Sequence, residues 1–207
     1  MFGPNRPEPK PGELPGRPVD PDTTGGYYQP TAAEIDGVLA LGSVRLSCGL
    51  VGAPRPALLE YNERYRANLN PRIAGVELGA GGLLLTPLEA EQPAAPVPTV
   101  AAGSSVPLRV FWEDCGASEA CGAEPYVSFD AEAGALVERR ESLRVAWYAS
   151  GGKFELELTG REEQDPGTDS QNTWFAPTEP GEHVLWLVLR DSRGGSSWHT
   201  YRAMVTP

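Results

Sequence analysis

Apolar and polar residues alternate in short segments through the last two thirds of the chain. A period of two places successive side chains on opposite faces of a strand. Segments of this kind, or short apolar runs, cover residues 73–78, 83–85, 106–112, 143–147, 154–158, 173–177, 184–189 and 198–205. Gly, Pro and Asp residues separate them, and no helical period lies between them. The pattern predicts an all-β, antiparallel β-sandwich.

Three features within this region add detail. Ser150-Gly151-Gly152 separates two alternating runs and predicts a hairpin turn. Residues 184–189 are apolar on both faces, which predicts a central strand buried inside the sandwich. The proline-rich residues 91–98 suit a crossing at a sheet edge.

Residues 31–69 have a different pattern. Alternation over residues 38–50 predicts one strand, and residues 58–67 predict a short helix. The stripe of that helix is formed by Leu58, Tyr61 and Tyr65. We expect this strand and helix to pack on the sandwich, which would occupy residues 70–207.

Residues 1–30 contain eight of the 21 prolines and few apolar side chains. Such a segment predicts an extended, polyproline-biased tether, with a PxxP-type ligand as the alternative. The residues after Met1 do not have the basic and then apolar pattern of a secretory signal. An exported chain would therefore carry its signal, or a lipidated cysteine, upstream of Met1.

The chain is acidic, with 28 Asp and Glu residues against 17 Lys and Arg residues and a net charge of −11. This charge argues against binding of nucleic acids or anionic membranes through a basic face. No apolar run approaches the roughly 18 residues that a membrane-spanning helix needs.

The three cysteines favour an oxidising compartment. Cys115 and Cys121 lie six residues apart in a loop of small residues, where a disulfide is the favoured interpretation and two free thiols are the alternative. Zinc binding lacks a second pair of ligands. Cys48 lies in an alternating segment and is interpreted as a small buried hydrophobic residue.

The C-terminal half contains a recognisable series of motifs. An aromatic–x–Ala–Pro segment at residues 174–177 is followed by a Pro-Gly turn, a long strand and an Asp–x–x–Gly–Gly turn at residues 191–195. These motifs resemble the closing hairpin of bacterial immunoglobulin-like and PKD-like domains. The other segments that resemble parts of such a domain are residues 70–73, 100–108 and 146–152. An inter-sheet disulfide of the immunoglobulin type is not evident, and the insertion at residues 113–142 is long.

The proline-rich leader and the Gly/Pro/Trp-rich style also resemble myxobacterial envelope lipoproteins. This resemblance implies an exported protein in the periplasm, at the outer membrane or on the cell surface. A lipid anchor at the N-terminus would be its contact with the membrane.

The five tryptophans are the largest apolar side chains. Trp147 and Trp186 are predicted to pack in the core. Trp198, His199 and Tyr201 form a candidate exposed platform for a glycan or peptide. In the 113–142 insertion, the candidate binding residues are Tyr126 and Phe129.

The polar residues suggest structural roles. Asp191 is predicted to cap the turn that follows it, and Arg193 is predicted to be solvated. The acidic segment at residues 161–172 is interpreted as a solvated loop. Calcium binding by Asp165, Asp169 and Asn172 is the alternative. No nucleophile elbow, zinc-protease or cofactor motif occurs, so the sequence predicts no catalytic residue and no cofactor.

The leading hypothesis is a non-catalytic, exported β-sandwich that acts as an interaction or assembly module of the cell envelope, with another envelope protein as its partner. A carbohydrate-binding or adhesion module is the first alternative, and an accessory domain of an envelope hydrolase is the second. The sequence leaves the oligomeric state open.

Overall fold

The computed structural model describes residues 26–47, 50, 53–89, 96–115 and 121–207. These residues form two compact units. The sandwich unit consists of Arg66–Tyr126 and Arg139–Pro207. The helix–hairpin unit consists of Val127–Glu138 and the part of the chain up to Tyr65.

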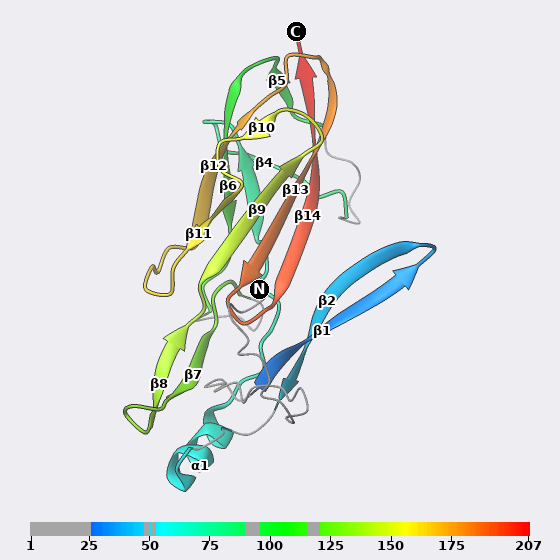
Figure 1. Cartoon of the computed structure of the whole chain (residues 1–207). Coiled ribbons are helices and arrows are strands. Elements are labelled where there is room, and N and C mark those ends of the chain that lie inside the picture. The colour runs from blue at the N-terminus through cyan, green and yellow to red at the C-terminus, as the bar shows by residue number, and fades with distance from the viewer. Residues whose placement is uncertain (1–25, 48–49, 51–52, 90–95, 116–120) are drawn as a thin grey trace. The chain divides into compact units, whose positions relative to one another are not determined.

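The sandwich unit is built from two five-stranded sheets (Figure 1). The first sheet has the order β10-β12-β6-β3-β4, formed by Lys153–Phe154, Asp169–Phe175, Ser105–Phe111, Gly75–Leu78 and Leu83–Leu84. The second has the order β11-β9-β13-β14-β5, formed by Leu158–Arg161, Leu143–Ala149, Gly181–Asp191, Ser196–Thr206 and Thr99–Ala101. Neighbouring strands are antiparallel, except that β5 runs parallel to β14.

Both sheets send alternate side chains into one core, which makes the unit a β-sandwich. Its largest buried members include Trp174 from the first sheet, and Trp147 and Leu187 from the second. The order β3-β6-β12-β10 matches strands A, B, E and D of an immunoglobulin-like domain, and β9-β13-β14 matches strands C, F and G. Trp147 on β9 holds the place of the core tryptophan on strand C. The predicted antiparallel immunoglobulin-like sandwich is therefore confirmed.

In the helix–hairpin unit, β1 (Gly26–Ile35) and β2 (Val38–Ser47) form an antiparallel hairpin. The turn is Asp36-Gly37, with φ of 52° and 80°, and two positive values are characteristic of a type I′ turn. The strand predicted at residues 38–50 is found as β2, whereas its partner β1 was not predicted, because β1 alternates too little in hydrophobicity to be recognised. The predicted end of the N-terminal tether, at residue 30, lies inside β1.

Helix α1 (Arg55–Arg64) begins three residues earlier than predicted, because a proline fits the first turn of a helix. Tyr61 of its predicted stripe is buried, and Leu58 and Tyr65 are partly buried. They pack in a small core with Val127 and Phe129 of β7 (Pro125–Asp130), which pairs with β8 (Ala135–Arg140). Part of the 113–142 insertion is thus a hairpin.

Some predictions concern residues outside the described part of the chain. These are the tether up to residue 25, the buried position of Cys48, and most of the proline-rich crossing. Among the described residues, no helix has the length and apolar character required to cross a membrane.

Candidate interaction surface

The outward side of the second sheet carries exposed aromatic side chains on three neighbouring strands. Tyr148 on β9 is 52% exposed, Trp186 on β13 is 37% exposed, and Trp198 on β14 is 62% exposed. Their strands lie side by side in the order β9-β13-β14 (Figure 1). Tyr148 and Trp186 point outward, because their chain neighbours Trp147, Leu185 and Leu187 are buried in the core. Trp198 points to the same side, because it pairs with Val188, two positions from Trp186.

Strand register arranges this surface in rows. Tyr148 pairs with Trp186, which pairs with Thr200. The next row contains Leu158, Ala146, Val188 and Trp198. Residues paired across neighbouring strands lie about 5 Å apart, so the rows form one continuous surface. We call the outward side of β9, β13 and β14, together with Leu158 of β11, the aromatic face.

Charged residues mark the two ends of the aromatic face. At one end, Arg190 pairs in register with Arg144, and Arg190 forms no ion pair with a carboxylate of the described residues. At the other end, the Glu182 carboxylate lies 3.5 Å from Nε of Arg202. The aromatic face therefore has a basic end and an end where opposite charges meet.

The predicted platform of Trp198, His199 and Tyr201 is only partly found. Trp198 is exposed, but Tyr201 is 1% exposed and belongs to the sandwich core. Residues 198 and 201 differ by an odd number of positions, so a strand places them on opposite faces. His199 points to the same side as Tyr201. The centres of their two rings lie 6.2 Å apart, with the edge of one ring toward the face of the other. Burial raises the pKa of Tyr201 far above its usual value.

The prediction that Trp186 packs in the core was wrong, whereas that for Trp147 is confirmed. A strand in a two-layer sandwich faces the core on one side only, so an apolar residue on its other side remains outside. The run at residues 184–189 is apolar on both sides. That feature was the signal in the sequence for an exposed apolar surface.

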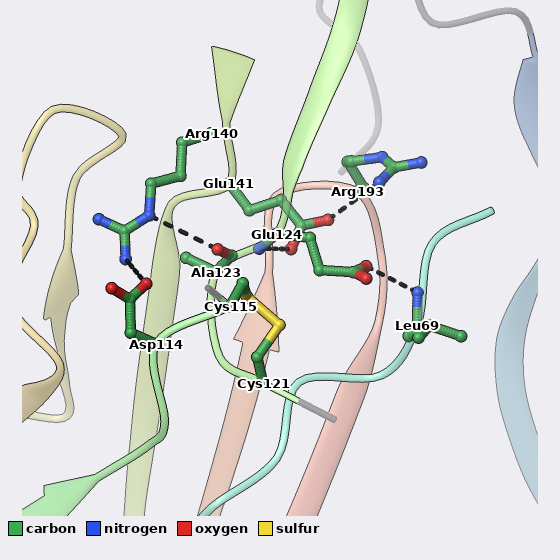
Figure 2. The surroundings of a disulfide bond; sticks show 9 residues. All are labelled: Leu69, Asp114, Cys115, Cys121, Ala123, Glu124, Arg140, Glu141 and Arg193. Carbon is green, nitrogen blue, oxygen red and sulfur yellow. Dashed lines mark hydrogen bonds and ion pairs between the residues drawn. A yellow bond between two sulfur atoms is a disulfide. The ribbon is translucent and has the colours of Figure 1, made fainter. Parts of the chain in front are cut away.

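The predicted disulfide joins Cys115 and Cys121. Figure 2 shows the polar cluster beside it. Nearby, the backbone N–H of Glu124 donates to the Glu141 carboxylate at 2.9 Å, and the Glu124 carboxylate accepts from the N–H of Leu69 at 2.9 Å. The N–H of Arg72 donates to the carbonyl of Cys121. These bonds tie separate segments of the sandwich unit together.

Glu141 is the most deeply buried carboxylate of this cluster, at 1% exposure. Its partner is Arg193, with Nη1 at 3.4 Å from the carboxylate. Burial first, and then the negative charge of Asp191, raise the pKa of Glu141 to about 8. Glu141 is therefore largely protonated at neutral pH.

The turn between β13 and β14 confirms one prediction and contradicts another. Asp191 accepts hydrogen bonds from the backbone N–H groups of Arg193 and Gly195, both at 2.8 Å, as expected of a capping aspartate. Arg193 was predicted to be solvated but is buried. It donates to the carbonyl of Arg66, and its guanidinium lies 5.0 Å from the ring centre of Tyr126.

The two candidate binding residues of the insertion have structural surroundings. Tyr126 packs against that guanidinium, and burial raises its pKa. Phe129 is 7% exposed and lies in the small core with α1, so its assignment as a binding residue was wrong. Alternation of β7 points Phe129 to the same side as Val127, which is also buried there.

The candidate calcium ligands are bound by protein groups. Arg161 donates to Asp165 at 2.8 Å and to Asp169 at 2.7 Å. Arg109 also donates to Asp169, and the side chain of Asn172 donates to the carbonyl of Leu156 at 2.7 Å. A calcium ion would have to displace these contacts. Over the part of the chain that the structure describes, no group of three or more His, Cys, Asp or Glu residues is placed to hold a metal.

No protein-family model matches this chain, and no curated protein sequence matches it.

Proposed function

We propose that this chain is an exported, non-catalytic module of the cell envelope that binds a partner protein through its aromatic face. The observation that carries the proposal is the exposure of Tyr148, Trp186 and Trp198 on three adjacent strands. Contiguous exposed apolar surface marks interaction sites on folded proteins. Tryptophan and tyrosine are also the residues most enriched among those that dominate binding energy.

The composition of the face favours a protein over a glycan. Beside the aromatic side chains lie Val184, Val188 and Leu158, which offer no hydrogen-bond partner to sugar hydroxyl groups, and the polar Thr200. The core of a protein interface has this mixture of aromatic and aliphatic side chains. Carbohydrate binding is the second candidate, and the exposed aromatic residues are the only feature that supports it.

Export and anchoring are further parts of the proposal. The Cys115–Cys121 disulfide is compatible with an exported protein, because such bonds persist in oxidising compartments. The envelope location and the lipid anchor rest on the resemblance of the leader to envelope lipoproteins. Counting free thiols in protein taken directly from cells tests the compartment: a pair that is reduced there would contradict export.

Site-specific photo-crosslinking in the producing cells tests the aromatic face. A photoreactive residue replaces Trp186 or Trp198 in one set of variants. In the control set it replaces Ser105 or Gln171, which are exposed on the outward side of the first sheet. We expect one discrete protein adduct from the aromatic face alone.

Two results would contradict this proposal. One is equal crosslinking from both sheets, and the other is the absence of a protein adduct from the aromatic face. If the chain instead bound to polysaccharide, and Trp198→Ser abolished that binding, the glycan alternative would replace the proposed protein partner.

A further inference from the structure

We infer that the partner on the aromatic face is a second copy of this chain, packed face to face with the two β13 strands antiparallel. The inference rests on the proposed function, because it names the partner of the same surface. It starts from the order of the outward residues on β13, the middle strand of its sheet. They are Glu182, Val184, Trp186, Val188 and Arg190.

This order is self-complementary. A two-fold axis in the plane of the interface, perpendicular to the strands at Trp186, reverses the direction of β13 in the second copy. The axis then places Glu182 of one copy over Arg190 of the other, and Val184 over Val188. Two-fold symmetry repeats each contact, as it does in isologous dimers. Packed sheets keep their strands within about 30° of each other, which preserves this match along the strand.

The neighbouring strands agree with the same axis. Thr200 pairs with Trp186, so it lies on the row of the axis. Trp198 and Arg202, two positions to either side of Thr200, therefore meet across the interface. A guanidinium over an indole is a favourable cation–π contact. Tyr148 also pairs with Trp186 and meets its own copy close to the axis.

Charge selects this orientation over the alternative. An axis parallel to the strands would place Arg190 over Arg190 and Glu182 over Glu182. Like charges opposed across an interface cost several kcal/mol, so this arrangement is disfavoured. The antiparallel arrangement instead provides two pairs of opposite charge at the ends of the interface.

The size of the face indicates a weak dimer. With strands about 4.8 Å apart and about 3.3 Å per residue, β9, β13 and β14 along residues 182–190 cover roughly 400 Å², because β11 and β5 lie only beside the two ends of this stretch. Two copies would bury about 800 Å², which is the size of weak, transient interfaces. We therefore expect a reversible dimer that forms with rising protein concentration.

Sedimentation velocity of the full chain tests the inference with a charge exchange. Glu182→Arg alone opposes two arginines, and Arg190→Glu alone opposes two glutamates. Each variant is expected to dimerise at least about tenfold more weakly than the wild type. An equimolar mixture of the two variants restores both opposite-charge pairs and is expected to form a heterodimer, followed through a fluorophore on one of them. The double variant is expected to dimerise like the wild type.

Matched controls make the same kinds of charge change at positions outside the aromatic face. Glu179→Arg and Arg72→Glu substitute exposed residues outside the second sheet and are expected to leave dimerisation unchanged. A wild-type chain that stays monomeric at several hundred micromolar would overturn the inference. So would single variants that dimerise like the wild type, or a mixture that forms no heterodimer.

This result is separable from the test of the proposed function. A monomeric chain whose aromatic face crosslinks to a different protein in cells would contradict the second copy and leave the proposed function standing. A monomeric chain without any adduct on that face would contradict both.

Discussion

Glu141 gives the sandwich unit a defined dependence of stability on pH. Its carboxyl group is almost fully buried, and Arg193 is the cation that it contacts. Asp191 and Glu124 add negative charge to the same cluster, and burial is the largest cause of its raised pKa of about 8. Glu141→Gln keeps the shape and an acceptor oxygen for the N–H of Glu124 but cannot ionise.

The direction of the effect follows from proton binding. An unfolded glutamate has a pKa of about 4.3, so between that value and about 8 the folded chain holds a proton that the unfolded chain has lost. The contribution is complete below the unfolded pKa and is lost as the pH rises through the folded pKa. The free energy of unfolding therefore falls by up to about 1.4 kcal/mol per pH unit, because of this one group. Between pH 5.5 and 7.5 the loss amounts to at most about 3 kcal/mol.

Urea unfolding followed by tryptophan fluorescence measures this slope. The free energy of unfolding of the wild type should fall relative to that of Glu141→Gln as the pH rises over this range. Glu179→Gln, at an exposed position, serves as the control and should parallel the wild type. Parallel curves for the wild type and Glu141→Gln would refute the assignment of the proton to Glu141.

Three other predictions concern stability, each read as the free energy of unfolding at constant pH. Replacing Cys115 and Cys121 by Ser opens a loop with a sequence separation of six and should cost about 2 kcal/mol; a variant as stable as the wild type would contradict it. Gly152→Ala should cost at least about 2 kcal/mol, because φ is +74° and a Cβ would meet the carbonyl of Phe175; an unchanged midpoint would show that the turn can rearrange. Trp147→Ala should cost about 3–5 kcal/mol and Trp198→Ala less than about 0.5 kcal/mol, since only Trp147 is buried; equal losses would contradict the assignment of core and surface.

The sandwich could be predicted because its strands alternate over a real core. Leu143, Val145 and Trp147 show the period directly, and all three are buried. The β1–β2 hairpin was missed because hydrophobic and polar residues hardly alternate in β1. Its turn would have identified it. Asp36-Gly37 is a favoured two-residue hairpin turn, and this dipeptide was the available signal.

Residue types alone were not enough to predict the aromatic face. Such a prediction also requires knowing which residues of a strand share a side and how many layers the fold has. Trp198 was a candidate from the sequence, but Tyr201 and His199 lie three and one positions away and point to the other side. Trp186 was assigned to the core because its strand is apolar throughout. Arg193 was predicted to be solvated because its partner Glu141 is 52 residues away, and local sequence carries no information on such a pair.

Hydroxyl-radical footprinting tests most directly whether the aromatic face binds a protein. Oxidation rates of Trp186 and Trp198 are measured in the chain in its native envelope and in the dilute purified chain. The rate of Phe175, on the outward side of the first sheet, serves as the internal reference. We predict that both tryptophans oxidise several-fold more slowly in the envelope, while Phe175 is unchanged. Equal rates for the two tryptophans in both settings would contradict the claim that this face is covered by a partner.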